Sequence, residues 1–197
     1  MITMCLPLML MAQNAWEAPE NESGEKVNPD EKYLAGAVPV VDGRVMFETT
    51  IDAPGKSAKE IYALVLDYLT ALSKEEGQFE QSGIKATDEQ AGNIVAQYQE
   101  TLIFKSTALV YDHTFFAYTI MANCYDGKLD VKMTRIYYIY PPEGDQPQKL
   151  VAEDTITDDY ALAKKGKKLS RVYGRFRRKT VDRKDYIFNK LQALVTK

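Results

Sequence analysis

Few side chains in this chain have the chemistry of a catalytic centre. It contains one histidine, His113, and two cysteines, of which Cys124 lies in the body of the sequence. We expect His113 at the turn between two strands, eleven residues before Cys124. That spacing does not place a base beside a thiol nucleophile, so we interpret the pair as a turn histidine and a small core cysteine.

Metal and phosphate motifs are also missing from the sequence. Acidic residues pair as Glu153-Asp154 and Asp158-Asp159 without a histidine or cysteine nearby, and no EF-hand, HExxH or CxxC motif occurs. Gly166-Lys167-Lys168 lacks the upstream glycine and the following Ser or Thr of a phosphate loop. We therefore expect no catalytic residue, no metal, no cofactor and no enzymatic activity; a hydrolase with two clustered carboxylates stays open as a third hypothesis.

The strongest local feature is a basic segment, residues 164–184. It holds eleven basic residues and one acidic residue, a net charge of +10 in a chain whose net charge is −3. One interpretation is solvated surface, or a segment docked on the acidic remainder of the chain. The other is an anion-binding patch, because guanidinium groups bind phosphate or carboxylate through two hydrogen bonds. The candidate patch residues are Arg171, Arg175, Arg177, Arg178 and Lys179.

Arg135 is a candidate ligand anchor. It shares strand parity with Leu129, Val131 and Met133, on what should be the core face of a strand. An inward arginine costs several kcal/mol unless it is paired. Three interpretations are open: an anchor for a ligand between sheet and helix, a pair with a buried carboxylate, or a β-bulge that turns the side chain outward.

Hydrophobic periodicity indicates the elements that position these residues. Residues 44–52 alternate as in a half-buried strand, and Ser57 and Glu60 form a capping box at the start of a helix with an apolar stripe. Further strands are expected over residues 82–87, 93–104, 114–125 and 128–140. Asp126-Gly127 is a hairpin signal between the last two.

The C-terminal third is less regular. Residues 151–163 are ambiguous between helix and irregular chain. Thr180 is a candidate cap for a final helix that has Asp182 and Asp185 in its first turn.

The first 32 residues differ in composition from the remainder of the chain. Residues 1–12 form an apolar run too short to span a membrane, and we expect them to be a partial signal peptide; a buried N-terminal segment is the alternative. Residues 13–32 are composed like a disordered spacer. Residues 33–197 fit a single domain, and the mature form is expected to have no transmembrane span.

The order β, α, four strands, α is opened by YLAGAVPVVDGRVMFETTI and closed by ITDDYALAKKGKKLSRVYGRFRRKTVDRKDYIF. In these stretches the chain resembles domain of unknown function family 4468, over most of its length beyond Glu31. The resemblance implies a fold like that of the TATA-box-binding protein (TBP), export in Bacteroidetes, and no activity to transfer. DNA binding does not follow, because there is one β-α-β unit rather than two, and exposed Glu48, Asp52 and Asp130 would repel phosphate.

We therefore expect a two-layer α+β domain, β-α-β(4)-α, with an antiparallel sheet of about five strands and two helices on one face. The expected function is a non-enzymatic cell-envelope interaction module in the periplasm or on the outer surface of a Gram-negative bacterium. Its partner would be an envelope protein or an anionic lipid or glycan bound through the basic segment, and not nucleic acid. The alternative is a small-ligand binder that uses a pocket between sheet and helix.

Overall fold

The computed structural model describes residues 14–17, 30–142 and 146–197. The described strands are β1 (Val40–Val41), β2 (Arg44–Asp52), β3 (Gly83–Asp88), β4 (Asn93–Ser106), β5 (Tyr111–Tyr125), β6 (Lys128–Tyr140), β7 (Gln148–Val151), β8 (Leu162–Ala163) and β9 (Lys168–Leu169). The described helices are α1 (Ala58–Leu72), α2 (Asp158–Ala161), α3 (Gly174–Val195) and the 3-10 helices η1 (Glu31–Tyr33) and η2 (Ala152–Asp154). The signal-peptide prediction, residues 1–12, lies outside the described residues.

Seven of the described strands form one antiparallel sheet. Its order is β1-β2-β6-β5-β4-β3, and β7 pairs with β6 outside this path. β5 pairs along one edge of β6, while β2 and β7 pair with its other edge, at Lys128–Thr134 and Tyr137–Tyr140 respectively. The sequence predicted about five strands; β1 and β7, of two and four residues, are too short to show a periodicity.

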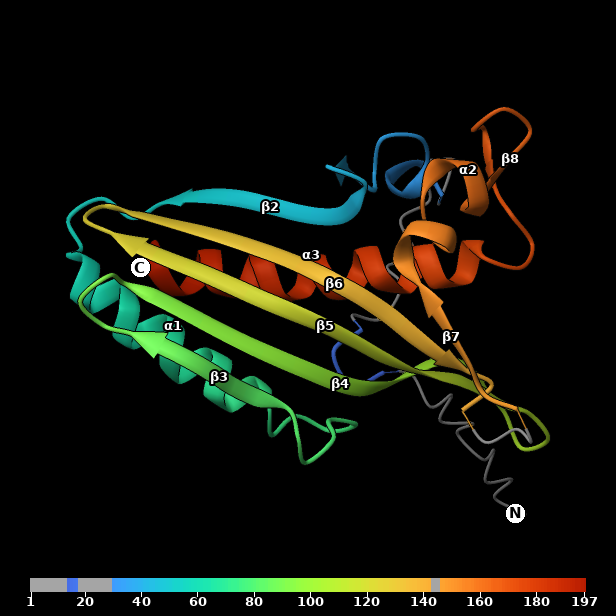
Figure 1. Ribbon diagram of the computed structural model, residues 1–197, viewed down its shortest axis with the longest axis horizontal. Coiled ribbons are helices and arrows are strands. Elements are labelled where there is room, and N and C mark those ends of the chain that lie inside the picture. Colours follow the sequence, from blue (N-terminus) through green and yellow to red (C-terminus); the bar gives the residue numbers. More distant parts are fainter. Residues whose placement is uncertain (1–13, 18–29, 143–145) are drawn as a thin grey trace, which may run out of the picture.

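The two long helices cover one face of this sheet. α1 and α3 contact each other and the strands behind which they lie in Figure 1. The opposite face, turned toward the viewer, has no long helix over it in the described part of the chain. The predicted two-layer α+β arrangement with both helices on one face is therefore confirmed.

α1 begins where its capping box predicts. The Ser57 hydroxyl accepts the Glu60 N–H at 3.3 Å, and the Glu60 carboxylate accepts the Ser57 N–H at 2.8 Å, so two orphan donors of the first turn are satisfied. The apolar stripe then packs on the sheet, with Ile61, Val65 and Leu69 fully buried. Burial of this stripe, more than propensity, holds the helix in place.

α3 begins earlier than predicted, at Gly174 instead of after Thr180. Thr180 lies inside the helix, buried, with its hydroxyl 2.6 Å from the hydroxyl of Tyr138. The face that packs on the sheet includes Arg177 and Arg183, both with no exposed surface. A search for apolar periodicity does not count arginines, so it missed the first two turns of the helix.

Residues 14–17, part of the predicted disordered spacer, pack against the domain. The Asn14 side chain makes two hydrogen bonds with the backbone of Ile103 in β4, and Glu17 pairs with Lys179. The Trp16 ring lies 5.1 Å from the guanidinium of Arg183, which pairs with buried Glu100 at 2.7 Å. This short segment therefore covers a buried ion pair.

The ambiguous region 151–163 contains η2, the single-turn helix α2 and strand β8. α2 leads directly into β8, which pairs with β9 in a separate two-stranded sheet. The region is therefore ordered, but each element in it is shorter than the windows that periodicity requires.

Candidate functional site

His113 and Cys124 lie in the same strand, β5, and do not form a pair. His113 is buried within the strand, with its ring 4.3 Å from that of Tyr111, and is not at a turn as predicted. Eleven residues along a strand span about 36 Å, and odd and even positions face opposite sides. Burial raises the pKa of the Cys124 thiol to about 11, so this thiol is a poor nucleophile at neutral pH.

The predicted patch of basic residues is largely occupied by internal partners. Arg177 is fully buried: its guanidinium donates to the carbonyls of Tyr33, Leu34 and Ile156, and it pairs with Asp158 at 2.7 Å. It therefore joins η1 to the segment before α2. This guanidinium is a structural cross-link with no surface to offer an external anion.

Three more patch residues also have carboxylate partners. Arg175 pairs with Asp112 and lies over the rings of Phe104 and Tyr140, at 4.6 and 5.0 Å. Arg178 pairs with Asp30, and Lys179 pairs with Glu17. Only Arg171 of the five is exposed without an ion pair in the described residues. Four of the five candidate patch residues are therefore paired with carboxylates of the same chain, as the interpretation of a docked segment predicts.

Arg135 lies at a β-bulge and faces away from the core. β5 and β6 change register between Ala117 and Thr119, and Arg135 has φ +54°. The extra residue reverses the parity of β6 beyond it, so that Ile136 and Tyr138 are buried and Arg135 is exposed. The expected core-facing position was wrong, and the bulge interpretation is the one that the structure shows.

A hollow of about 540 Å³ lies around Arg135, on the face of the sheet opposite the helices. Its floor is Ala117 and Thr119 of β5, which are small and buried. Residues with longer side chains on the neighbouring strands and in the segments beside them form its walls. These are Arg44, Gln81, Lys85, Gln97, Gln99, Arg135, Tyr137, Lys149, Val151 and Glu153.

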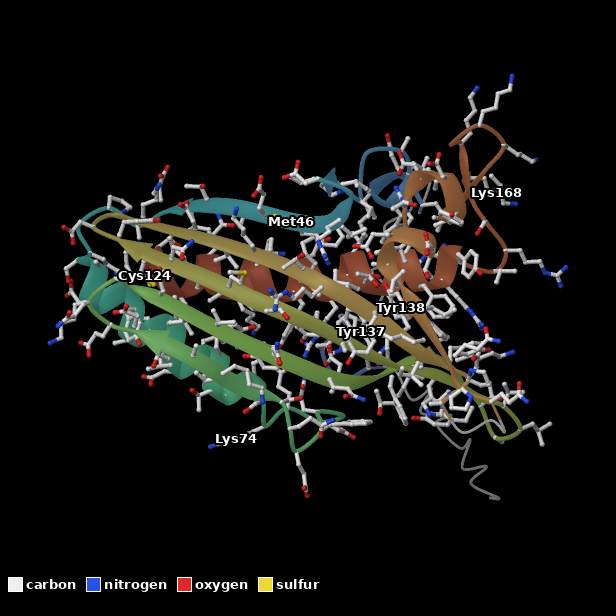
Figure 2. All side chains as sticks on the ribbon, in the orientation of Figure 1. Met46, Lys74, Cys124, Tyr137, Tyr138 and Lys168 are labelled. Atoms are coloured by element: carbon white, nitrogen blue, oxygen red, sulfur yellow. The ribbon has the colours of Figure 1, made fainter. Side chains whose placement is uncertain are left out.

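Strand register places each small floor residue beside at least one longer wall residue. In one cross-strand row Gln97 pairs with Thr119, which pairs with Thr134; in the next, Gln99 pairs with Ala117, which pairs with Tyr137. Facing positions on adjacent strands lie close enough for their side chains to touch. The hollow thus results from two small residues at the centre of a wide sheet. Figure 2 labels Tyr137, which lies in the C-terminal part of β6 where β7 pairs with it.

The hollow opens where β2 gives way to β7 along β6. β2 pairs as far as Thr134 and β7 begins to pair at Tyr137, so the ladder has a gap at the bulge. Two side chains satisfy backbone groups there: the Glu153 carboxylate accepts the Val45 N–H at 2.9 Å, and the Thr134 hydroxyl donates to the Val45 carbonyl. Both backbone groups of Val45 are therefore paired although the ladder is interrupted there.

The charge of the hollow is strongly positive in an acidic protein. Four cations line it, Arg44, Lys85, Arg135 and Lys149, together with one carboxylate, so its formal charge is +3 while the chain has −3. Within the described residues none of these four makes an ion pair. Lys149 lies 4.1 Å from the centre of the Tyr137 ring. The arrangement can bind an anion by charge and by hydrogen bonds.

The sequence indicated Arg135 as a candidate site residue but not the other three cations that line the hollow. Arg44, Lys85 and Lys149 come from three other strands or strand ends, and only the sheet topology brings them together. A weak signal was present for part of the lining: Arg44 begins a strand that was predicted, and the outward faces of β4 and β6 carry Gln97, Gln99 and Tyr137, whereas Lys149 lies in a strand too short to predict.

Among the described residues, no group of three histidine, cysteine or acidic side chains is placed to hold a metal ion. None of the described helices has both the length and the apolar composition needed to cross a bilayer.

The chain is similar to one family model and to solved structures from two bacteria. A family model described as a domain of unknown function (DUF4468) with TBP-like fold matches residues 47–139. A DUF4468 family protein from Bacteroides ovatus has 35% identity, with 87% of this chain and 97% of that chain covered and a TM-score of 0.79. A TBP-like protein from Parabacteroides distasonis shares the fold at 18% identity, with 80% and 96% covered and a TM-score of 0.63. No curated protein matches the chain.

Proposed function

Because the chain belongs to the DUF4468 family, a domain of unknown function with a TBP-like fold, we propose its function from its own hollow: a non-enzymatic cell-envelope module that binds an anionic ligand on the open face of the sheet. The observation that carries this proposal is the cluster of four cations without ion-pair partners in the described residues around a hollow of about 540 Å³. That volume lies in the range of small-ligand sites, roughly 300–1,000 Å³.

Electrostatics favours an anion in this hollow. Like charges gathered in one concavity repel each other and raise the local positive potential, and a bound anion relieves this repulsion. Arg44 and Arg135 can each hold a carboxylate or phosphate through two hydrogen bonds, while Gln97 and Gln99 offer amides to neighbouring hydroxyl groups. The chemistry fits an anionic group on a polar scaffold.

Backbone strain at Arg135 adds support. A left-handed conformation at a residue other than glycine is uncommon and costs roughly 1 kcal/mol, and Arg135 adopts it with φ +54°. Strained residues that persist tend to lie at functional sites. Here the strained residue places a guanidinium at the edge of the hollow instead of in the core.

The lining residues support binding more than catalysis. The described lining contains no histidine, cysteine or serine, and its one carboxylate, Glu153, already accepts the Val45 N–H. General acid–base chemistry most often uses a histidine or a carboxylate that is free to meet the substrate. The proposed ligand is therefore held and released unchanged. The envelope location rests on the predicted leader.

Thermal unfolding with defined probes tests the proposal. We expect glucuronate and glucose 6-phosphate to raise Tm and neutral glucose to leave it unchanged, because a ligand at about 100 times its Kd stabilises the folded state by about 2.7 kcal/mol. The double variant Arg135→Gln, Lys149→Gln should lose the shift. A control with the same loss of charge, Lys74→Gln, Lys197→Gln, should keep it.

Two results would overturn the proposal: no Tm shift with either anion, or a shift that persists in the hollow variant. Native mass spectrometry of the protein from its own organism gives an independent readout. A discrete added small mass that disappears in the hollow variant is the expected result. A bare protein in both forms would contradict a retained ligand.

A further inference from the structure

The β8–β9 hairpin presents the basic residues of segment 164–184 that have no internal partner. We define the lysine hairpin as residues 162–169, whose four lysines are Lys164, Lys165, Lys167 and Lys168. All four are exposed, and none has an ion-pair partner among the described residues. Arg171 follows directly and is also exposed. Figure 2 shows Lys168 at the periphery of the molecule, beside β8.

The hairpin is fixed to the body of the protein and is not a loose tail. The Ser170 N–H donates to the Ala161 carbonyl at 2.7 Å, and Leu162 pairs with Leu169, whose side chain is buried. At the tip, a β-carbon on Gly166 would lie 3.6 Å from that of Ala35. The lysines are therefore presented on an anchored framework, which lowers the ordering entropy lost on binding.

The tip has a backbone conformation that lysine rarely adopts. Lys164 and Lys165 have φ of +51° and +58°, and Gly166 has φ +84°. Left-handed positions favour glycine or asparagine. Two lysines in sequence at such positions put extra positive charge on the tip at a conformational cost of roughly 1 kcal/mol each, which indicates a use for that charge.

Apolar side chains flank the base of the hairpin. The hydrogen bond between Ser170 and Ala161 closes the base of the hairpin. Tyr160 precedes this base in the sequence and Arg171-Val172 follows it, so these residues lie at the same end of the hairpin. Tyr160 is 48% exposed and Val172 is 59% exposed. Tyrosine with nearby apolar and basic side chains is the combination that enters the headgroup region of a bilayer.

We propose that the lysine hairpin, with Arg171, Tyr160 and Val172, docks the protein on an anionic phospholipid surface. Lysines near such a surface are attracted by its negative potential, while Tyr160 and Val172 bury apolar surface between the headgroups. Asp159, exposed on α2, reduces the local charge but leaves it positive against five cations. An acidic glycan would use the cations alone and would leave the two apolar side chains in water, so lipid fits better.

The test is flotation of the protein with vesicles of phosphatidylcholine and phosphatidylglycerol, compared with vesicles of phosphatidylcholine alone. We expect salt-sensitive binding to the anionic vesicles only. The variant Lys164→Gln, Lys165→Gln, Lys167→Gln, Lys168→Gln should bind on the order of 1,000-fold less well, because each of the four lysines contributes about 1 kcal/mol near the surface. A control that removes four exposed lysines elsewhere, Lys74→Gln, Lys105→Gln, Lys190→Gln, Lys197→Gln, should bind like the wild type.

Two further arms decide between lipid and other partners. Tyr160→Ser with Val172→Ser should weaken vesicle binding several-fold and leave retention on an alginate column unchanged. The hollow variant Arg135→Gln, Lys149→Gln should still float. The proposal is overturned if the protein binds no anionic vesicle, if the lysine control fails equally, or if it binds alginate but not vesicles.

Discussion

Arg171 and Arg177 belong to the same basic segment, and their surroundings are opposite. Arg177 has no exposed surface and donates to three carbonyls, whereas Arg171 is exposed. Removing a buried donor leaves its acceptors unsatisfied, which costs about 1–3 kcal/mol for each group. The position of an arginine in this chain therefore decides whether its guanidinium binds groups of the same chain or can bind an external partner.

Arg177→Met should lower the free energy of unfolding by roughly 3–5 kcal/mol, because the carbonyls that join η1 to the segment before α2 lose their donor. Arg171→Met, the matched control, should change it by less than about 0.5 kcal/mol. Urea denaturation followed by circular dichroism measures both. Equal stability of the two variants would show that the buried cross-link contributes nothing.

Cys124 should resist thiol reagents in the folded protein. Burial raises its pKa to about 11, so at neutral pH the protonated thiol predominates and is also shielded. In a Cys5→Ser background, which leaves Cys124 as the one thiol, we expect no reaction with Ellman's reagent until denaturant is added. Rapid labelling under native conditions would contradict the buried position.

For individual residues, the sequence predicted which side chains are unusual better than it predicted where they point and what they contact. The small core cysteine and the unusual Arg135 were both identified from their neighbours in sequence. The outward position of Arg135 depends on a bulge, which inserts one residue without a signal in the alternation. The pairing of Arg175 with Asp112 depends on the fold, since 63 residues separate them.

Elements with a strong local signal were predictable. The capping box at Ser57 and Glu60 predicted the start of α1, and the alternation of apolar residues predicted β2. The short strands β1 and β7 and the first turns of α3 were not found. Their formation depends on tertiary contacts: β7 on the free edge of β6, and the start of α3 on buried arginines.

Ser57→Ala should lower the free energy of unfolding by about 1 kcal/mol at neutral pH, because the first turn of α1 loses its cap. Hydrogen bonds from Ser57 hold the pKa of Glu60 below its ordinary value of 4.5. The pKa of Glu60 is lower in the folded state than in the unfolded state. The stabilisation that comes from its ionised carboxylate is therefore complete above pH 4.5 and is lost as the pH falls through the folded-state pKa.

The difference in stability between wild type and Ser57→Ala should therefore shrink in acid. Urea denaturation at neutral pH and well below pH 4.5 measures this difference. Ser57→Asp keeps a capping acceptor and serves as the control, with neutral-pH stability close to that of the wild type. A difference that does not depend on pH would exclude the contribution of the Glu60 carboxylate.

The whole molecule is a broad sheet with its two long helices on one face (Figure 1). The charged hollow lies on the other face. The architecture could be predicted because element order and a single apolar face per element leave few layered arrangements. The hollow could not be predicted from the sequence, because it depends on strand order and on the gap between β2 and β7. Strand order is set by contacts between residues that are distant in sequence.

Deletion of residues 1–17 should destabilise the domain without unfolding it. The deletion removes the two Asn14 bonds to Ile103, the pair between Glu17 and Lys179, and the Trp16 ring over Arg183. We expect a loss of about 2–3 kcal/mol, mainly from the aromatic side chain. Thermal unfolding measures it. Identical Tm values for the two forms would show that the segment does not dock in solution.

Trp16 is the only tryptophan in the chain, and it lies in this docked segment, 6.2 Å from the ring of Tyr186. Indole emission therefore reports on a single site, where the N-terminal segment contacts the ion pair of Arg183 and Glu100. Undocking moves the indole into water and shifts its emission to the red while far-ultraviolet circular dichroism stays constant. The protein thus contains its own optical probe, which separates release of the segment from loss of the fold without any added label.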